Sequence, residues 1–90
     1  MNTDDDAALR DALGQVLGQV LGLTPARLAA LTPDTPLLGA LPELDSMAIA
    51  TLFAAIEDHF GLMFDDAELT GETLTTFGTL LALVRRKRAA

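Results

Sequence analysis

Three segments of this 90-residue chain place apolar side chains at helical spacing, and this pattern constrains the fold more than any other feature. Apolar residues three and four positions apart lie on one face of an α-helix, so each segment would bury a stripe of its surface. We expect helices over residues 4–21, 46–60 and 76–87. Their stripes are formed by Leu9, Leu13, Val16, Leu17, Val20, Leu21, by Ile49, Leu52, Phe53, Ile56, Phe60, and by Phe77, Leu80, Leu81 and Val84. The pattern predicts an all-α fold.

The connection between the first two helices, residues 23–44, contains all four prolines of the chain. It is interrupted too often to form one regular element. Thr24 and Pro25 are typical of the N-cap and first turn of a short helix, which we expect to extend to Leu31. Several leucines of the connection are expected to fold it back over the core: Leu28, Leu31, Leu37, Leu38 and Leu41.

Gly14 and Gly18 lie inside the first predicted helix, where a glycine costs roughly 1 kcal/mol of stability against alanine. A glycine also lets a neighbouring segment approach closely, because no Cβ occupies the space. We therefore expect another helix to pack against the first helix at these two positions.

The segment after the helix over 46–60 predicts a looped link, with at most a brief helix near residues 66–70. We expect three main helices plus a short third helix, which together form a small four-helix bundle with a long first loop. Ninety residues are enough for one modest hydrophobic core, so residues 1–90 are expected to form a single domain.

The composition excludes several classes of protein. Half of the residues are hydrophobic, but only four are Phe and none is Trp or Tyr, which favours an aliphatic helical core. There is no cysteine and only one histidine, His59, which excludes disulfides, thiolate sites and metal sites built on several imidazoles. No stretch approaches the roughly 20 apolar residues of a membrane-spanning helix, and the acidic start is unlike a secretory signal. We expect a soluble, cytoplasmic monomer.

The charge of the chain is unevenly distributed. The formal net charge is −7, and the "RRKR" run at residues 85–88 holds four of the six basic residues. The other two basic residues and all thirteen acidic ones leave −11 on residues 1–84. Such a body repels nucleic acid and attracts basic protein surfaces. We interpret the basic run as a solvated helix end that complements the helix dipole, with nucleic-acid or lipid binding as the alternative.

The stretch "PELDSMAIATLF" places Asp45 and Ser46 directly before the second apolar segment, where either side chain could cap a helix. A nucleophilic serine needs a base within hydrogen-bond reach. His59 lies thirteen residues further along the same predicted helix, which is about 20 Å at 1.5 Å per residue. No Gly-x-Ser-x-Gly motif surrounds Ser46. We therefore expect no catalytic residues and no enzyme activity.

Ser46 is better placed for covalent modification. A hydroxyl in the first turn of a helix lies at the positive end of the dipole, where backbone N–H groups favour an attached phosphodiester. Asp45 beside it supplies a carboxylate that a modifying enzyme could recognise through a metal ion or basic groups.

The Asp45-Ser46-Met47 triplet resembles the Asp-Ser-Leu signature of acyl carrier proteins. The likeness covers nearly the whole chain: an acidic first helix, a Pro-rich loop, "LG" before the serine, "EDHFG", "MFDDAEL" and a final amphipathic helix. It implies that Ser46 carries 4′-phosphopantetheine, transferred from coenzyme A by a phosphopantetheinyl transferase that recognises Asp45. The phosphopantetheine thiol would hold acyl groups for fatty-acid, polyketide or related biosynthesis.

The partners implied by this resemblance are acyl-activating ligases, synthases and acyltransferases. The alternative from the residues alone is a non-catalytic, acidic helical interaction module in which Ser46 is only a helix cap.

The expected partner surface departs from the family pattern. Carriers of fatty-acid synthesis usually display several acids just after the modified serine, whereas this chain has Ala48, Ala50 and Thr51 there. The residues expected to bind partners are Met47, Ala50, Thr51, Ala54, Glu57 and Asp58. Apolar contact would carry most of the recognition and the two acids would add modest steering, which indicates a specialised carrier. The loop "LGALPELDS" is also longer than the common "LGADS" form, with Leu44 in place of a small residue.

The resemblance also implies that an acyl chain can be sheltered among the helices. The expected lining is Ile49, Phe53, Ile56, Leu69 and Leu74. The alternative, that these residues only form the core, stays open.

The acidic residues of the link are not expected to bind a metal. Asp65, Asp66, Glu68 and Glu72 lack the spacing of a calcium-binding loop. His59 is expected to be an exposed residue near a helix end, without a functional role.

Overall fold

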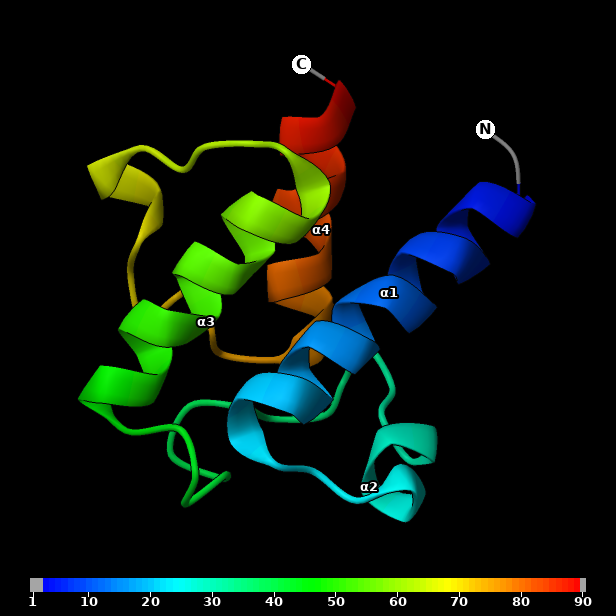
Figure 1. The fold of residues 1–90 in the computed structure, drawn as a ribbon, viewed down its shortest axis with the longest axis vertical. Coiled ribbons are helices and arrows are strands. Elements are labelled where there is room, and N and C mark those ends of the chain that lie inside the picture. Colours follow the sequence, from blue (N-terminus) through cyan, green and yellow to red (C-terminus); the bar gives the residue numbers. More distant parts are fainter. Residues whose placement is uncertain (1–2, 90) are drawn as a thin grey trace.

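The computed structural model describes residues 3–89, and the side chains of residues 7–88. Four α-helices follow one another: α1 (Thr3–Leu21), α2 (Pro25–Ala29), α3 (Ser46–Phe60) and α4 (Phe77–Ala89). A single 3₁₀ turn, η1 (Asp66–Glu68), lies between α3 and α4. In Figure 1, α1, α3 and α4 form the body of the molecule and α2 lies beside the C-terminal end of α1. The described residues contain no strand, so the predicted all-α four-helix fold is confirmed.

The core is aliphatic and follows the three predicted stripes. Every stripe residue is buried except Val20, Ile49 and Phe60, which are partly buried against the same core. Leu83 of α4 and Phe64 of the link are also buried, and neither was predicted. The described helices include none long and apolar enough to cross a membrane.

The close approach expected at Gly18 is confirmed. A Cβ at this position would lie 2.8 Å from Leu28 Cδ1, because α2 folds back onto α1 at this point. Gly14 is different, since a Cβ there would meet only Leu31 Cδ1, at 3.9 Å, which is ordinary van der Waals contact. A Cβ therefore fits at position 14 without rearrangement, whereas at position 18 the Leu28 side chain would have to move.

The long first connection is held to the chain segment before α4 by backbone hydrogen bonds. Leu37 N donates to Thr75 O at 3.1 Å, and Leu38 N donates to Leu74 O at 2.9 Å. Leu37 is fully buried, whereas Leu38 is 42% exposed, so the prediction that Leu38 packs on the core is wrong. Leu38 begins a turn over residues 38–40, and its side chain lies outside the core that the Leu37 side chain enters.

The predicted ends of the helices differ from the observed ones by at most two residues. Thr24 Oγ1 accepts a hydrogen bond from Arg27 N at 3.2 Å and caps α2, as expected, but α2 ends at Ala29 and not at Leu31. The helix predicted from 76 begins at Phe77. The brief helix expected near residues 66–70 is the 3₁₀ turn η1.

Candidate functional site

Asp45 is the N-cap of α3. Its backbone is extended (φ −92°, ψ −178°), and its Oδ1 accepts a hydrogen bond from Ala48 N at 2.8 Å. This bond satisfies one of the backbone N–H groups that the start of a helix leaves without an internal partner. Ser46 is consequently the first residue of the helix and not its cap.

The Ser46 hydroxyl is left available by this arrangement. The residue is exposed, and its side chain makes no hydrogen bond to any residue that the structure describes. Ser46 is also the only serine in the chain. Ser46 and Met47 occupy the first two helical positions, whose N–H groups have no partner inside a helix. A phosphate on the Ser46 oxygen would lie at the positive end of the α3 dipole.

Leu44 anchors the chain directly before the cap. Its side chain is buried in the core, and its N–H donates to Leu41 O at 3.0 Å. The leucine that departs from the family pattern thus has a packing role. It fixes the point at which the chain leaves the core and turns into α3.

The side of α3 that faces solvent is apolar over its first two turns. Met47 is 80% exposed, and Ala50, Thr51 and Ala54 are exposed as well. Thr51 Oγ1 donates to Met47 O at 3.0 Å, so its hydroxyl is engaged by the helix and its methyl group remains for contact. No acidic residue lies in the first turn of α3.

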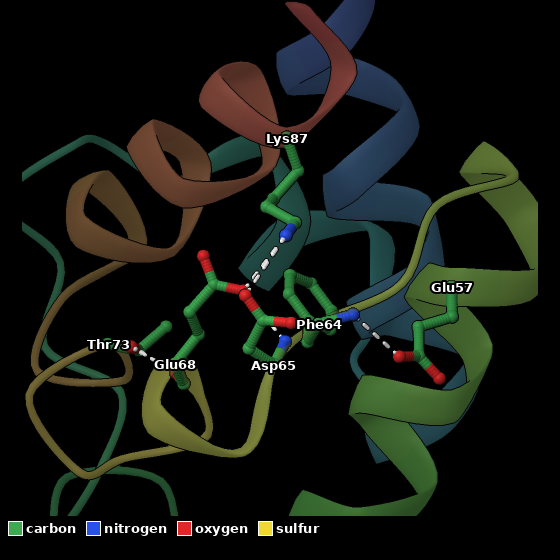
Figure 2. Close-up of polar contacts among 6 residues, drawn as sticks. All are labelled: Glu57, Phe64, Asp65, Glu68, Thr73 and Lys87. Carbon is green, nitrogen blue, oxygen red and sulfur yellow. Dashed lines mark hydrogen bonds and ion pairs between the residues drawn. The ribbon is translucent and has the colours of Figure 1, made fainter. Parts of the chain in front are cut away.

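The two acids of the expected partner surface differ in their surroundings. Glu57 is partly buried, and its Oε2 accepts a hydrogen bond from Phe64 N at 2.8 Å (Figure 2). This bond ties the link after α3 back onto the helix. Asp58 is exposed, and its carboxylate has no hydrogen bond or ion pair with a described residue.

Sequence reasoning missed an ion pair between the basic run and η1. Lys87 Nζ lies 3.1 Å from Glu68 Oε1 and 3.9 Å from Asp65 Oδ2, and only 20% of the Lys87 side chain is exposed (Figure 2). Lys87 is therefore not simply a solvated residue at a helix end. The acids at positions 65 and 68, three residues apart on one turn, were the available signal for a lysine partner.

Glu68 has further bonds within the same turn. Its Oε1 accepts a hydrogen bond from Asp65 N at 2.8 Å, and Thr73 Oγ1 donates to the Glu68 carbonyl oxygen at 2.7 Å. The hydrogen bond from Asp65 N, and then the one from Lys87, lower the pKa of the Glu68 carboxyl below its ordinary value. These contacts hold η1, in the link that follows α3, against the side of α4.

Most of the residues expected to line an acyl cavity belong to the hydrophobic core. Phe53, Ile56 and Leu74 are buried, and the Phe53 ring meets the Phe64 ring edge to face with centroids 5.2 Å apart. Leu69 is 41% exposed and does not line the interior. Two hollows, of 410 Å³ and 180 Å³, are lined by other residues, on the α1 and α2 side of the molecule.

His59 and the acids of the link lie apart from Ser46 in the sequence. His59 is exposed on the last turn of α3, with its ring edge to face with that of Phe60 at 4.8 Å between centroids. Among the residues that the structure describes, no group of three or more His, Asp or Glu side chains is placed to hold a metal ion.

Comparison with known proteins identifies the class to which this arrangement belongs. Residues 8–85 match the protein family described as the phosphopantetheine attachment site. No curated protein matches the chain, but three chains of solved structures do. One is the solution NMR structure of a holo acyl carrier protein from Nitrosomonas europaea, 38% identical to this chain. The similarity covers 90% of this chain and 96% of that one, with a TM-score of 0.83.

The chain therefore belongs to the phosphopantetheine attachment-site family of carriers. Within this family it is an acyl carrier protein, which carries acyl groups on a covalently attached 4′-phosphopantetheine. Carriers of this kind are generally non-catalytic and interact with the enzymes of a synthesis pathway.

Proposed function

We propose that Ser46 is the residue to which 4′-phosphopantetheine is attached. The observation that carries the proposal is that Asp45, and not Ser46, caps α3, which leaves the chain's only serine hydroxyl exposed and without a described partner. The alternative role of Ser46 as only a helix cap lacks this support, because the capping bond is made by its neighbour.

The residues around Ser46 fit the attached group. The free N–H groups at the start of α3 offer donors to the phosphodiester, and the carboxylate of Asp45 beside Ser46 is engaged by its hydrogen bond from Ala48 N. Asp45 uses Oδ1 in the cap, so Oδ2 remains for the metal ion or basic groups of a phosphopantetheinyl transferase. When bound, the phosphopantetheine supplies a thiol that holds the acyl group as a thioester.

The proposal includes the setting in which the carrier works. Residues 1–90 act as one cytoplasmic, monomeric carrier domain without catalytic residues of its own. Its partners are the transferase that loads it and the acyl-activating ligases, synthases or acyltransferases that use it. It binds neither nucleic acid nor metal.

Partners recognise the carrier through α3. Met47, Ala50, Thr51 and Ala54 provide the apolar contact, and the exposed carboxylate of Asp58 provides steering. Glu57 contributes less steering than Asp58, because its carboxylate is engaged by Phe64 N. This recognition surface supports a specialised carrier over a fatty-acid synthesis carrier that relies on acidic contacts.

The test is an intact-mass measurement after incubation with coenzyme A, magnesium and a broad-specificity phosphopantetheinyl transferase. The parent chain and Thr51→Ala, which removes another exposed hydroxyl of α3, are each expected to gain one phosphopantetheine. Ser46→Ala is expected to gain none. A Ser46→Ala variant that still gains the group would overturn the proposal, as would a parent chain that no transferase loads.

A further inference from the structure

The chain segment that leads to Asp45 and Ser46, residues 37–44, is attached to the rest of the molecule at two buried leucines. Leu37 at its start and Leu44 at its end are both buried in the core. Between them the backbone makes tight turns, in which Ala40 N and Leu41 N both donate to Leu37 O, at 3.2 Å and 3.0 Å. The direction in which this segment enters α3 determines where the Ser46 hydroxyl points.

One ion pair joins this segment to α2. The guanidinium of Arg27 donates from Nη1 to Glu43 Oε2 and from Nη2, at 3.3 Å, to Glu43 Oε1. Two parallel bonds between a planar guanidinium and a carboxylate fix orientation as well as distance. Glu43 lies only two residues before the cap Asp45, so the pair holds the backbone close to the modification site.

The packing beside Arg27 is incomplete. A hollow of 180 Å³ is lined by Arg27 of α2, Leu41 of the segment and Leu31, among others. Apolar contact between α2 and the segment therefore has a gap next to Arg27, the residue of α2 that forms the ion pair with Glu43. The hydrogen bond from Arg27 also lowers the pKa of the Glu43 carboxyl below its ordinary value.

An exposed ion pair contributes little to the free energy of unfolding. About two fifths of the Arg27 side chain and one third of the Glu43 side chain are exposed. The arrangement is thus better suited to fixing the position of a segment than to stabilising the fold.

We propose that Arg27 is a positioning residue for the loading of Ser46, acting through its two bonds to Glu43. The inference rests on the proposed attachment at Ser46. In that step Ser46 Oγ forms a bond to the phosphorus next to the pantetheine, the pyrophosphate bond of coenzyme A breaks with release of adenosine 3′,5′-bisphosphate, and the hydroxyl proton passes to a base of the transferase. The Arg27–Glu43 pair limits the orientations of the segment, and so presents the hydroxyl to the transferase in one direction.

The test compares loading kinetics of Arg27→Glu, Glu43→Arg and the exchanged double variant that carries both substitutions. Each single variant is expected to lower kcat/KM for loading roughly two- to fivefold, which corresponds to the usual range for an exposed ion pair. The double variant restores the pair with its charges exchanged, and is expected to return to within about twofold of the parent.

Charge-matched controls separate positioning from a general effect of charge. Arg10→Glu and Glu72→Arg make the same changes of charge at exposed positions outside this segment, and are expected to load like the parent chain. Circular dichroism and thermal unfolding confirm that all variants fold. Hydrogen exchange of the Leu44 amide, which is bonded to Leu41 O, is expected to speed up in the single variants and to recover in the double variant.

Single variants that load at the parent rate would overturn the inference. So would a double variant that loads no better than the single variants, because this result indicates direct contact of Arg27 or Glu43 with the transferase. Failure of the attachment proposal is distinguishable, since in that case the parent chain itself is not loaded at Ser46.

Discussion

At the residue scale, two adjacent side chains at the start of α3 have different roles: one caps the helix and the other is left free. Asp45 satisfies the helix by accepting from Ala48 N, and Ser46 has no bond to a described residue. The sequence alone did not decide which of the two residues caps the helix, because aspartate and serine are both favoured at the N-cap position. Only the backbone conformation decides between them, and the extended backbone of Asp45 places its carboxylate over the first turn.

This division predicts unequal effects on stability. Asp45→Ala removes the cap and is expected to lower the free energy of unfolding by about 1 kcal/mol, whereas Asp45→Asn keeps an acceptor and costs less. Ser46→Ala removes no contact with a described residue and is expected to change stability by less than about 0.5 kcal/mol. Urea unfolding of the three variants measures these differences. A Ser46→Ala variant as destabilised as Asp45→Ala would show that the cap is misassigned.

The lowered pKa of Glu68 predicts that the free energy of unfolding depends on pH. Its folded-state pKa lies below the ordinary value of 4.5, chiefly because the carboxylate accepts from Asp65 N and also because it pairs with Lys87. A lowered folded-state pKa stabilises the fold above the unfolded value, and this contribution is lost as pH falls through the folded value. The contribution of Glu68 is measured as the difference in free energy of unfolding between the parent chain and Glu68→Gln at several pH values. The parent chain is expected to be more stable than Glu68→Gln by a constant amount near neutral pH, and this difference is expected to shrink below about pH 4.5. An advantage that grows towards low pH would contradict this account.

At the scale of elements, the predictions from sequence held where the signal was local. Helical spacing placed α1, α3 and α4, and the Thr24-Pro25 pair placed the start of α2. Gly61, with φ of 65°, ends α3. Helix stripes and caps depend on residues a few positions apart, which the sequence shows directly.

Contacts between distant segments could not be predicted in this way. Arg27 and Glu43 are sixteen residues apart, and Lys87 and Glu68 are further apart still. The exposure of Leu38 depends on which of two adjacent leucines faces the core, a choice fixed by backbone bonds to the segment before α4. Ser46 could be named as a candidate from sequence, but its free hydroxyl could not.

The two glycines of α1 provide a matched pair of variants. Gly14→Ala is expected to raise the free energy of unfolding by about 0.5–1 kcal/mol, because it gains helix propensity and meets Leu31 only at ordinary contact distance. Gly18→Ala gains the same propensity but forces Leu28 to move from a Cβ 2.8 Å away, and overpacking typically costs about 1–3 kcal/mol. Gly18→Ala is therefore expected to be less stable than Gly14→Ala in thermal and urea unfolding. Equal effects of the two substitutions would contradict the packing of α2 on α1.

At the scale of the whole molecule, the proposed attachment site and the basic run lie apart. Figure 1 shows the start of α3 and the C-terminal end of α4 at opposite ends of the molecule, whose longest extent is 34 Å. The basic residues therefore do not surround Ser46. The proposed partner surface is apolar at Met47, Ala50 and Ala54, and its charge comes from Glu57 and Asp58.

This distribution predicts weak salt dependence of partner binding. The association rate with an enzyme that acylates the loaded carrier is expected to fall less than about threefold between 50 mM and 500 mM salt, because apolar contacts are not screened. Ala50→Glu and Ala54→Glu place acids on the same surface and are expected to steepen this dependence towards a partner with a basic surface. Stopped-flow binding measures the rates. A tenfold or steeper fall for the parent chain would show that recognition is mainly electrostatic.

The central claim is that a single hydroxyl, left free because its neighbour caps the helix, carries the phosphopantetheine. Tandem mass spectrometry of the proteolysed, loaded chain tests it most directly, because fragment ions locate the modification on one residue. The account predicts the group on Ser46 in every modified peptide and an unmodified Asp45 and Met47 on either side. Phosphopantetheine located on any threonine, or on no residue of the segment that starts α3, would contradict it.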